Sequence, residues 1–292
     1  MLDLEALLRQ GRFPPHIASR RSWDVIVRDR YGEAFPIFQL GKNPVYQINA
    51  AALSAVIDKP TAAVKYIPDW TIAISEVIYS LRYSGTIGPK IYDVTCNPDI
   101  LPEGVEIVME TAFGSIHAAR YRGISFDNPD IQLNLAYAVA ELAYVMEQDG
   151  VSHCDMKPEN IFLYFDHDGS SFYRLGDFGL ARPTEEIVEV MHGPPHIYGT
   201  VGYMSPEFVT EGSSHPVPDI FSYGMFLSWL VVGSLPEELN FDHSQESRVR
   251  YINLMRTGEY RRLIQARLPL NSHPLVLEVL NECIDSSSAR PT

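Results

Sequence analysis

The sequence predicts an α+β fold in which a strand-rich first part is followed by a helix-rich second part. Its 292 residues are enough for one large domain or for two lobes around a cleft. Strand-like segments follow one another from Phe35 to Glu110, and a strongly helical segment runs from Ile131 to Gln148. The apolar segment from Ile220 to Leu235 predicts a buried core helix.

The composition is that of a globular protein, with 46% hydrophobic and 21% charged residues. The net charge of −14 argues against a nucleic-acid-binding surface and favours a basic partner or substrate. The three cysteines show no C-x-x-C spacing, so we expect neither a disulfide framework nor a zinc site, and a cytoplasmic or nuclear setting. Nothing in the sequence indicates the oligomeric state.

No targeting or membrane-spanning segment is expected. Residues 1 to 12 contain acidic residues and no sufficient apolar run. The segment from Ile220 to Leu235 is shorter than the about 20 residues that a membrane span needs. We expect an N-terminal extension over residues 1–30, a first lobe over 31–110 and a second lobe over 111–292.

The first lobe is expected to contain five strands and one helix. The predicted strands are Phe38 to Leu40, Tyr46 to Val56, Ala62 to Ile67, Ile87 to Val94 and Val105 to Glu110. The helix runs from Ile72 to Leu81 and has Glu76 as its only acidic residue. Lys65 lies in an otherwise apolar strand, where a cation needs a partner.

A predicted hairpin in the second lobe brings two metal-binding side chains together. Residues 161–165 and 172–175 are rich in β-branched and aromatic residues, and turn formers separate them. Because a hairpin returns the chain to its start, we expect Asn160 and Asp177 to finish close together. Amide and carboxylate oxygens beside a phosphate are what Mg²⁺ prefers. The sequence therefore predicts a magnesium site there.

The tight loop just before the hairpin carries Asp155 and Lys157. The Asp155 carboxylate can accept the proton of an attacking hydroxyl. The Lys157 ammonium can offset charge that develops on a transferred phosphoryl group.

These motifs resemble those of the protein kinase family. Residues 153–160, HCDMKPEN, are similar to its catalytic loop H-R-D-x-K-x-x-N, and residues 177–179 are its D-F-G turn. Residues 199–207, GTVGYMSPE, resemble G-T-x-x-Y-x-x-P-E, and residues 219–224 resemble D-x-W-S-x-G. The last two motifs are typical of protein-phosphorylating members rather than of small-molecule kinases.

The resemblance implies a two-lobed fold and an ATP- and Mg²⁺-dependent transfer of phosphate to serine or threonine hydroxyls of a protein. Asp155, Lys157 and Thr200 would be catalytic, with the Thr200 hydroxyl bonding both others, and Asn160 and Asp177 would bind Mg²⁺. The implied nucleotide-binding residues are Gly41, Ile48, Ala63, Lys65, Glu76, Met109, Glu110 and Ala112.

Supporting roles also follow from the resemblance. His153 would brace the loop, Asp219 would hold the loop backbone, and Arg290 would pair with Glu207. An acidic residue at Glu159 is typical of members that prefer basic residues before the acceptor. The family's final helix is expected to be absent or truncated.

Two departures from the family pattern affect the predicted function. In the glycine-rich loop, Gly41 is present, but Asn43 and Tyr46 replace two glycines, so ATP should be covered less tightly. The alternative is therefore a pseudokinase, a nucleotide-binding scaffold without turnover. Cys154 replaces the arginine that binds a phosphorylated activation loop, which predicts activity that does not wait for that phosphorylation.

Overall fold

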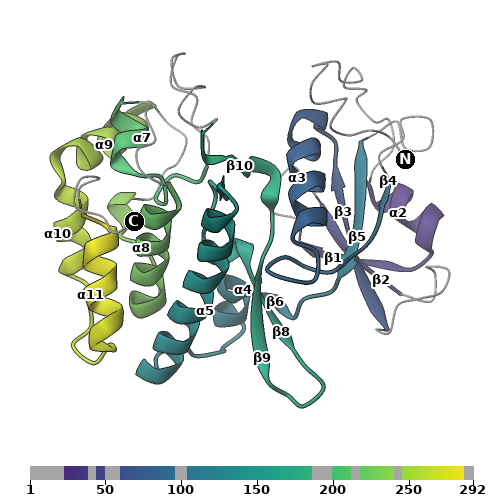
Figure 1. Cartoon of the computed structure of the whole chain (residues 1–292), viewed down its shortest axis with the longest axis horizontal. Helices are drawn as coiled ribbons and strands as arrows, with labels where there is room; N and C mark the ends of the chain where they lie inside the picture. Colours follow the sequence, from purple (N-terminus) through teal and green to yellow (C-terminus); the bar gives the residue numbers. More distant parts are fainter. Residues whose placement is uncertain are drawn as a thin grey trace. The chain divides into compact units, whose positions relative to one another are not determined.

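The computed structural model describes residues 23–38, 44–49, 60–95, 104–185, 199–211, 218–239 and 245–285. The chain divides into two compact units. The first comprises Met1–Phe113 with Gly176–Gly179, and the second comprises Gly114–Leu175 with Leu180–Thr292. The first contains a β-sheet and the second is mainly helical, which confirms the predicted α+β class (Figure 1).

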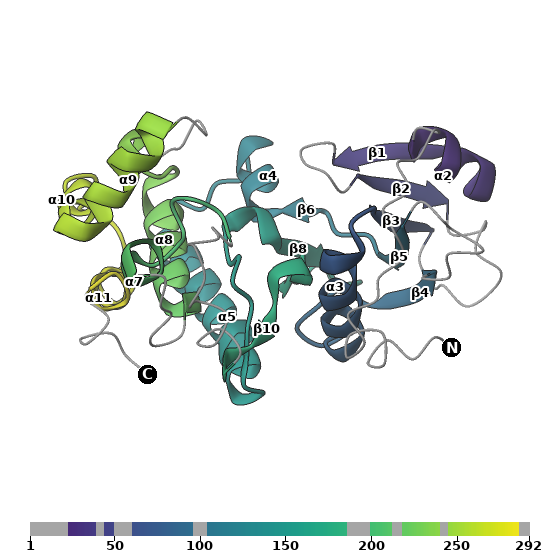
Figure 2. The same ribbon diagram turned by 90° about the horizontal axis from the view of Figure 1, so that it is seen from above.

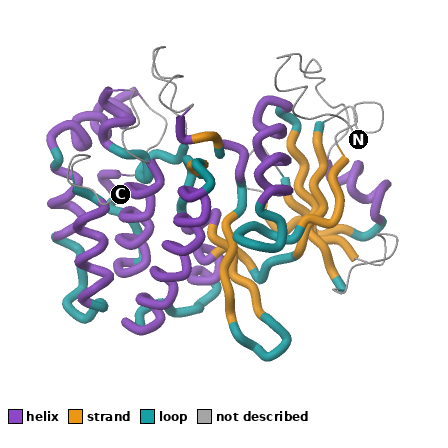
Figure 3. Tube along the Cα trace, in the orientation of Figure 1, coloured by secondary structure: helices purple, strands orange, loops and turns teal. Residues whose placement is uncertain are grey.

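An antiparallel five-stranded sheet forms the centre of the first unit, with strand order β1-β2-β3-β5-β4. Strands are drawn in orange in Figure 3. Its strands are β1 (Ala34–Phe38), β2 (Val45–Asn49), β3 (Thr61–Ile67), β4 (Ile91–Thr95) and β5 (Val105–Glu110). Five strands are present as expected, but β1 shares only Phe38 with the expected first strand, Phe38 to Leu40. The fourth begins later than expected, because glycines at 85 and 88 and a proline at 89 favour a turn, which the Gly88 N–H closes by donating to the Tyr83 carbonyl at 3.0 Å.

Two helices cover opposite faces of this sheet (Figure 2). Helix α2 (Trp23–Tyr31) places Val27 in an apolar cluster with Tyr46, Ile48, Ala62 and Val64. Helix α3 (Trp70–Arg82) packs against the other face; that cluster comprises Ile67, Trp70, Ala73, Val77, Val105 and Ile107. Alternate residues of β3 thus point to different helices.

A buried carboxylate fastens α2 to the sheet. Glu106 of β5 is fully buried, and it accepts hydrogen bonds from the Tyr31 hydroxyl at 2.5 Å and from the Arg30 guanidinium at 3.0 Å. These bonds compensate for the removal of the carboxylate from water. Helix α2 is therefore part of the first unit's core.

Seven helices are described in the second unit: α4 (Ile116–Tyr121), α5 (Pro129–Gln148), α7 (Pro206–Glu211), α8 (Pro218–Val232), α9 (Gln245–Thr257), α10 (Glu259–Gln265) and α11 (Pro274–Cys283). Its described strands are β6 (Gly114–Ser115), β7 (Val151–Ser152), β8 (Ile161–Phe165), β9 (Ser171–Leu175) and β10 (Arg182–Pro183). Short 3₁₀ turns of the second unit are η2 (Pro158–Asn160) and η5 (Glu237–Leu239), whereas η3 (Phe178–Leu180) begins in the first unit.

Helix α5, expected from its apolar face, begins at a well-formed cap. The Asn128 side chain accepts hydrogen bonds from the backbone N–H groups of Asp130 at 2.8 Å and Ile131 at 3.3 Å, and Pro129 occupies the first helical position. The helix delivers the chain to β7 and so to the loop that begins at His153.

Helix α8 is the predicted buried helix, and it packs against α5 and α11 (Figure 1). Phe221, Met225 and Leu230 are fully buried. At Gly224, an added Cβ would lie 2.8 Å from atoms of Cys283 and Ile284, so glycine lets α8 and the end of α11 approach closely. Among the described residues, no helix combines the length and the hydropathy that a membrane span needs.

Candidate active site

The loop from His153 to Asn160 is held in shape by Asp219, near the start of α8. One Asp219 oxygen accepts the His153 backbone N–H at 2.6 Å, and the other accepts that of Cys154 at 2.9 Å. The buried His153 ring also accepts the Asp155 backbone N–H on Nδ1 at 3.3 Å. Cys154 adopts φ 62°, a left-handed conformation unusual for a side-chain-bearing residue. These bonds hold the loop in its strained form.

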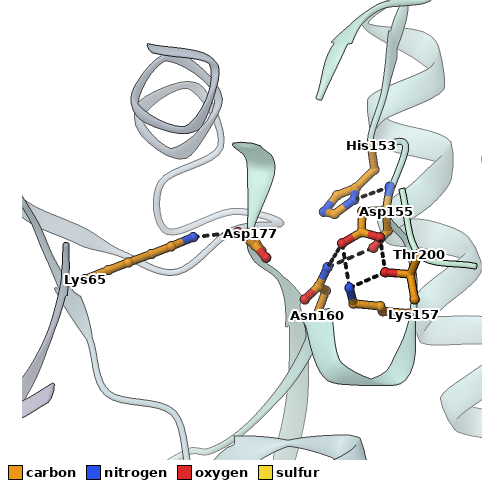
Figure 4. Close-up of polar contacts among 7 residues, drawn as sticks. All are labelled: Lys65, His153, Asp155, Lys157, Asn160, Asp177 and Thr200. Carbon is orange, nitrogen blue, oxygen red and sulfur yellow. Dashed lines mark hydrogen bonds and ion pairs between the residues drawn. The ribbon is translucent and has the colours of Figure 1, made fainter. Parts of the chain in front are cut away.

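The four predicted catalytic and metal-binding residues of the second unit meet around the Asp155 carboxylate (Figure 4). Lys157 Nζ donates to Asp155 Oδ2 at 2.7 Å and to Thr200 Oγ1 at 2.5 Å. Thr200 Oγ1 donates in turn to Asp155 Oδ1 at 2.7 Å. Asn160 Nδ2 donates to Asp155 Oδ2 at 2.9 Å and to its backbone carbonyl at 2.8 Å. A mostly buried carboxylate is thereby fixed in orientation.

The amide of Asn160 is oriented by the same bonds. Because its nitrogen donates twice to Asp155, its oxygen points away from that residue (Figure 4). An oriented amide oxygen is a suitable ligand for a hard cation such as Mg²⁺.

The expected hairpin follows immediately. Strands β8 and β9 pair in a register that runs from Ile161 opposite Leu175 to Phe165 opposite Ser171. Asn160 precedes the first of these paired residues, and Asp177 comes two positions after Leu175. The turn closes where the Asp166 N–H donates to the Ser170 carbonyl at 2.8 Å.

The first unit contains a separate charged group, made of Lys65, Glu76 and Asp177. Lys65 Nζ, on β3, lies 2.8 Å from Glu76 Oε1 of α3 and 2.6 Å from Asp177 Oδ1 (Figure 4 shows the latter pair). The structure thus brings together Lys65 and Glu76, two of the implied nucleotide-binding residues. Asp177 adopts φ 65°, so it too is held in a left-handed conformation.

One ammonium is shared by two carboxylates in this group. Burial alone would lower the pKa of Lys65, but the negative charges of Asp177 and Glu76 outweigh it and raise the pKa, so the ammonium form persists. Burial raises the pKa of Glu76, and the nearby Asp177 charge adds to that rise, while Lys65 opposes it. The excess of carboxylate over ammonium favours the approach of a further cation.

The rest of the D-F-G turn is packed closely in the first unit. The Phe178 ring lies 5.7 Å from that of Tyr83, and its edge is 3.1 Å from a Cβ built at Gly88. A Cβ at Gly179 would lie 2.5 Å from an Ile72 methyl group, so a larger residue there would force the Ile72 side chain or the turn to move. This packing fixes the segment that carries Asp177.

The sheet face that bears Lys65 also carries Ala63 and Met109. Ala63 pairs with Met109 across β3 and β5, and directly opposed residues of an antiparallel pair point to the same face. Glu110 is buried at the end of β5 and its N–H donates to the Lys90 carbonyl at 2.8 Å; Ala112 follows in the connecting segment. Binding of the nucleotide by Ala63, Met109, Glu110 and Ala112 stays a prediction.

Ile48 was predicted to bind the nucleotide, but its side chain does not lie on the sheet face that carries Lys65. Ile48 pairs with Ala62 and is buried in the cluster that includes Val27 of α2, on the side of the sheet opposite Lys65. Gln47 instead lies opposite Ala63, and Val45 lies opposite Lys65. A shift of one residue in register moves a side chain to the other face, and motif spacing alone did not fix that register. Gln47, which is partly exposed, therefore lies on the Lys65 face, where motif spacing did not place it.

Some predicted features lie outside the described residues. They are Gly41 and Asn43 of the glycine-rich loop, Cys96, and the Arg290 partner proposed for Glu207.

Comparison with known proteins decides the family. The sequence-family model of the protein kinase domain matches residues 80–291, which is well over half of the chain. The chain belongs to the protein kinase domain family. The match begins after Lys65 and Glu76, so the assignment of those two residues rests on the geometry of the first unit.

Similar curated proteins are plant kinases. The proline-rich receptor-like protein kinase PERK8 of Arabidopsis thaliana is 30% identical over 166 residues, which cover 53% of this chain and 24% of that protein. The serine/threonine-protein kinase PCRK1 of the same plant is 30% identical over 174 residues, or 56% of this chain and 40% of that protein. The leucine-rich repeat receptor-like serine/threonine/tyrosine-protein kinase SOBIR1, also from Arabidopsis thaliana, is 34% identical over 130 residues, or 44% and 19%. The matched region thus spans less than half the length of each of these relatives.

Proposed function

We propose that this protein kinase domain transfers the γ-phosphate of MgATP to serine or threonine hydroxyls of a protein substrate. The observation that carries the proposal is the orientation of the Asp155 carboxylate by Lys157, Asn160 and Thr200 within the second unit. An oriented carboxylate beside an ammonium is what a hydroxyl nucleophile and a transferred phosphoryl group require.

The substrate hydroxyl oxygen forms a bond to the γ-phosphorus, the bond from that phosphorus to the β–γ bridging oxygen breaks, and ADP leaves. Asp155 orients the hydroxyl and takes up its proton. Lys157, 2.7 Å from Asp155, offsets the negative charge on the transferred group.

Each of the two predicted Mg²⁺ ligands suits a magnesium ion within its own unit. In the second unit, Asn160 offers an amide oxygen oriented away from Asp155, and in the first unit, Asp177 offers a carboxylate whose side chain is 43% exposed. Mg²⁺ bound by such ligands would neutralise charge on the phosphate oxygens. Lys65, oriented by Glu76, would bind the α- and β-phosphates.

The acceptor class is supported by two observations. Thr200 bonds both Lys157 and Asp155, the arrangement implied for serine/threonine-specific members, and PCRK1 is named a serine/threonine-protein kinase. Glu159, 3.6 Å from His117, adds negative charge next to the catalytic loop and favours basic residues in the substrate.

The test is transfer of labelled phosphate from MgATP to a generic basic protein and to the chain itself, beside the Asp155→Asn variant. Asparagine keeps the size of the side chain but cannot accept the proton, so transfer should fall by roughly 10²–10⁴-fold. Equal transfer by both proteins would overturn the role of Asp155. If neither transfers phosphate while both bind nucleotide, the domain is a pseudokinase and a scaffolding function replaces the proposed one.

A further inference from the structure

We propose that Tyr251 of α9 is a positioning residue that holds the acceptor segment, Gly199–Pro206, so that the Thr200 hydroxyl meets the Asp155 carboxylate. This inference rests on the proposed function, because the acceptor segment is where a substrate hydroxyl would approach Asp155. No motif in the sequence points to Tyr251, and it does not itself touch the reacting groups.

The Tyr251 hydroxyl makes two bonds to the backbone of the acceptor segment. It accepts the Gly202 N–H at 3.1 Å and donates to the Met204 carbonyl at 3.4 Å. Making the two bonds together requires the neutral phenol, since a phenolate could accept the Gly202 N–H but could not donate to the Met204 carbonyl. Burial raises the pKa of Tyr251, which keeps the hydroxyl protonated.

The bonded turn leads directly to Thr200. The Tyr203 N–H donates to the Thr200 carbonyl at 3.0 Å, so Thr200 is linked through the backbone to the residues that Tyr251 holds. On the other side, the Ser222 hydroxyl of α8 donates to the Tyr203 carbonyl at 2.7 Å. The turn is therefore fastened to two helices, α8 through Ser222 and α9 through Tyr251.

Tyr251 satisfies the buried backbone N–H of Gly202. The φ of Gly202, +94°, is a glycine conformation. Removing the Tyr251 oxygen would leave a buried donor unsatisfied, which favours a rearrangement of the turn. Because Thr200 Oγ1 lies only 2.7 Å from Asp155 Oδ1, a small shift of the turn breaks that bond.

The chain supplies a matched control in Tyr260 of α10. Its hydroxyl is also buried and also donates to a backbone carbonyl, that of Ile284 at 2.8 Å, but it makes no bond to the acceptor segment. Tyr251→Phe and Tyr260→Phe each remove one buried hydroxyl. A purely structural role for Tyr251 therefore predicts the same behaviour in both variants.

The experiment measures kcat/KM for phosphate transfer to a basic protein and the Kd for MgATP in both variants. Tyr251→Phe should lower kcat/KM by about tenfold, the equivalent of one hydrogen bond, and leave the MgATP Kd unchanged. Tyr260→Phe should stay within about twofold of the wild type in both quantities. Equal losses in the two variants, or wild-type transfer by Tyr251→Phe, would overturn the inference.

A combined variant tests the route through Thr200. If Tyr251 acts by positioning Thr200, adding Tyr251→Phe to a Thr200→Val variant should lower kcat/KM little further. The fold-losses in kcat/KM of the two single variants should therefore not multiply. Fully multiplicative losses would contradict the proposed route.

Amide hydrogen exchange gives a readout that needs no turnover. Exchange in residues 199–206 should speed up in Tyr251→Phe and stay unchanged in Tyr260→Phe. Unchanged exchange in both would overturn the inference even if the wild type were inactive. An inactive wild type with the expected exchange pattern would count against the proposed function alone.

Discussion

The two polar groups of this protein kinase domain are assembled in different ways. In the second unit, Asp155, Lys157 and Asn160 come from one short loop, and only Thr200 joins them from elsewhere, 45 positions after Asp155. In the first unit, Lys65 meets Asp177 across 112 positions of sequence. The sequence spacing within one loop is enough to bring Asp155, Lys157 and Asn160 together. The meeting of Lys65 and Asp177 depends instead on how the chain of the first unit folds around its sheet.

Their charge balance also differs. The Asp155 carboxylate is matched by the Lys157 ammonium and by two neutral donors, Asn160 and Thr200. Lys65 is matched by two carboxylates, Glu76 and Asp177. The balanced group is suited to orienting a hydroxyl, and the group with excess negative charge is suited to receiving a cation.

The largest expected difference between the groups is in stability. Lys65→Met leaves Glu76, whose side chain is 3% exposed, without its cation, so the free energy of unfolding should fall by about 3 kcal/mol in urea titrations. Lys157→Met should cost only about 1 kcal/mol, because Asp155 keeps its bonds to Asn160 and Thr200. Replacing Glu76 by Leu as well should restore much of the loss at Lys65. Equal losses of unfolding free energy in Lys65→Met and Lys157→Met would contradict the difference in charge balance between the two groups.

A smaller effect concerns the strained residue next to Asp155. Burial, with a further contribution from Asp219, raises the pKa of the Cys154 thiol. A raised pKa leaves less thiolate at any given pH, so at pH 8 alkylation of Cys154 by iodoacetamide should be at least about tenfold slower than in the urea-unfolded chain. Mass spectrometry of the modified peptide measures the rate. The same rate in both states would show that the loop is not held as described.

The smallest effect distinguishes neighbouring residues of β2. Gln47→Ala should raise the MgATP Kd by about threefold, because Gln47 lies on the Lys65 face opposite Ala63. Ile48→Val should lower the free energy of unfolding by about 1 kcal/mol and leave the Kd unchanged, because Ile48 packs towards α2. Isothermal titration calorimetry measures the Kd. A Kd that changes in Ile48→Val and not in Gln47→Ala would instead support Ile48 as the nucleotide-binding residue.

Local features of the fold could be predicted from the sequence. The hairpin of β8 and β9 was predictable because turn formers separate two β-rich segments, and α5 because its apolar residues recur at helical spacing. The residues around Asp155 were found because loop spacing brings them together whatever the rest of the chain does.

The register of β2 was not predictable in the same way. Val45, Tyr46 and Ile48 are apolar or aromatic and only Gln47 is polar, so the residue types of β2 do not alternate cleanly enough to show which set faces Lys65. Tyr251 was missed for a related reason: its partners, Gly202 and Met204, lie in a distant segment and bond through the backbone, which leaves no side-chain pattern in the sequence.

In the proposed function, the Lys65 group binds the nucleotide and the Asp155 group performs the transfer. The most direct test measures the MgATP Kd and the phosphate-transfer rate together in Lys65→Met and Asp155→Asn. Lys65→Met should weaken MgATP binding at least about tenfold, the loss expected when a charge-assisted contact to phosphate is removed. Asp155→Asn should bind MgATP like the wild type and lose transfer. Wild-type binding by Lys65→Met, or wild-type transfer by Asp155→Asn, would contradict this division of roles.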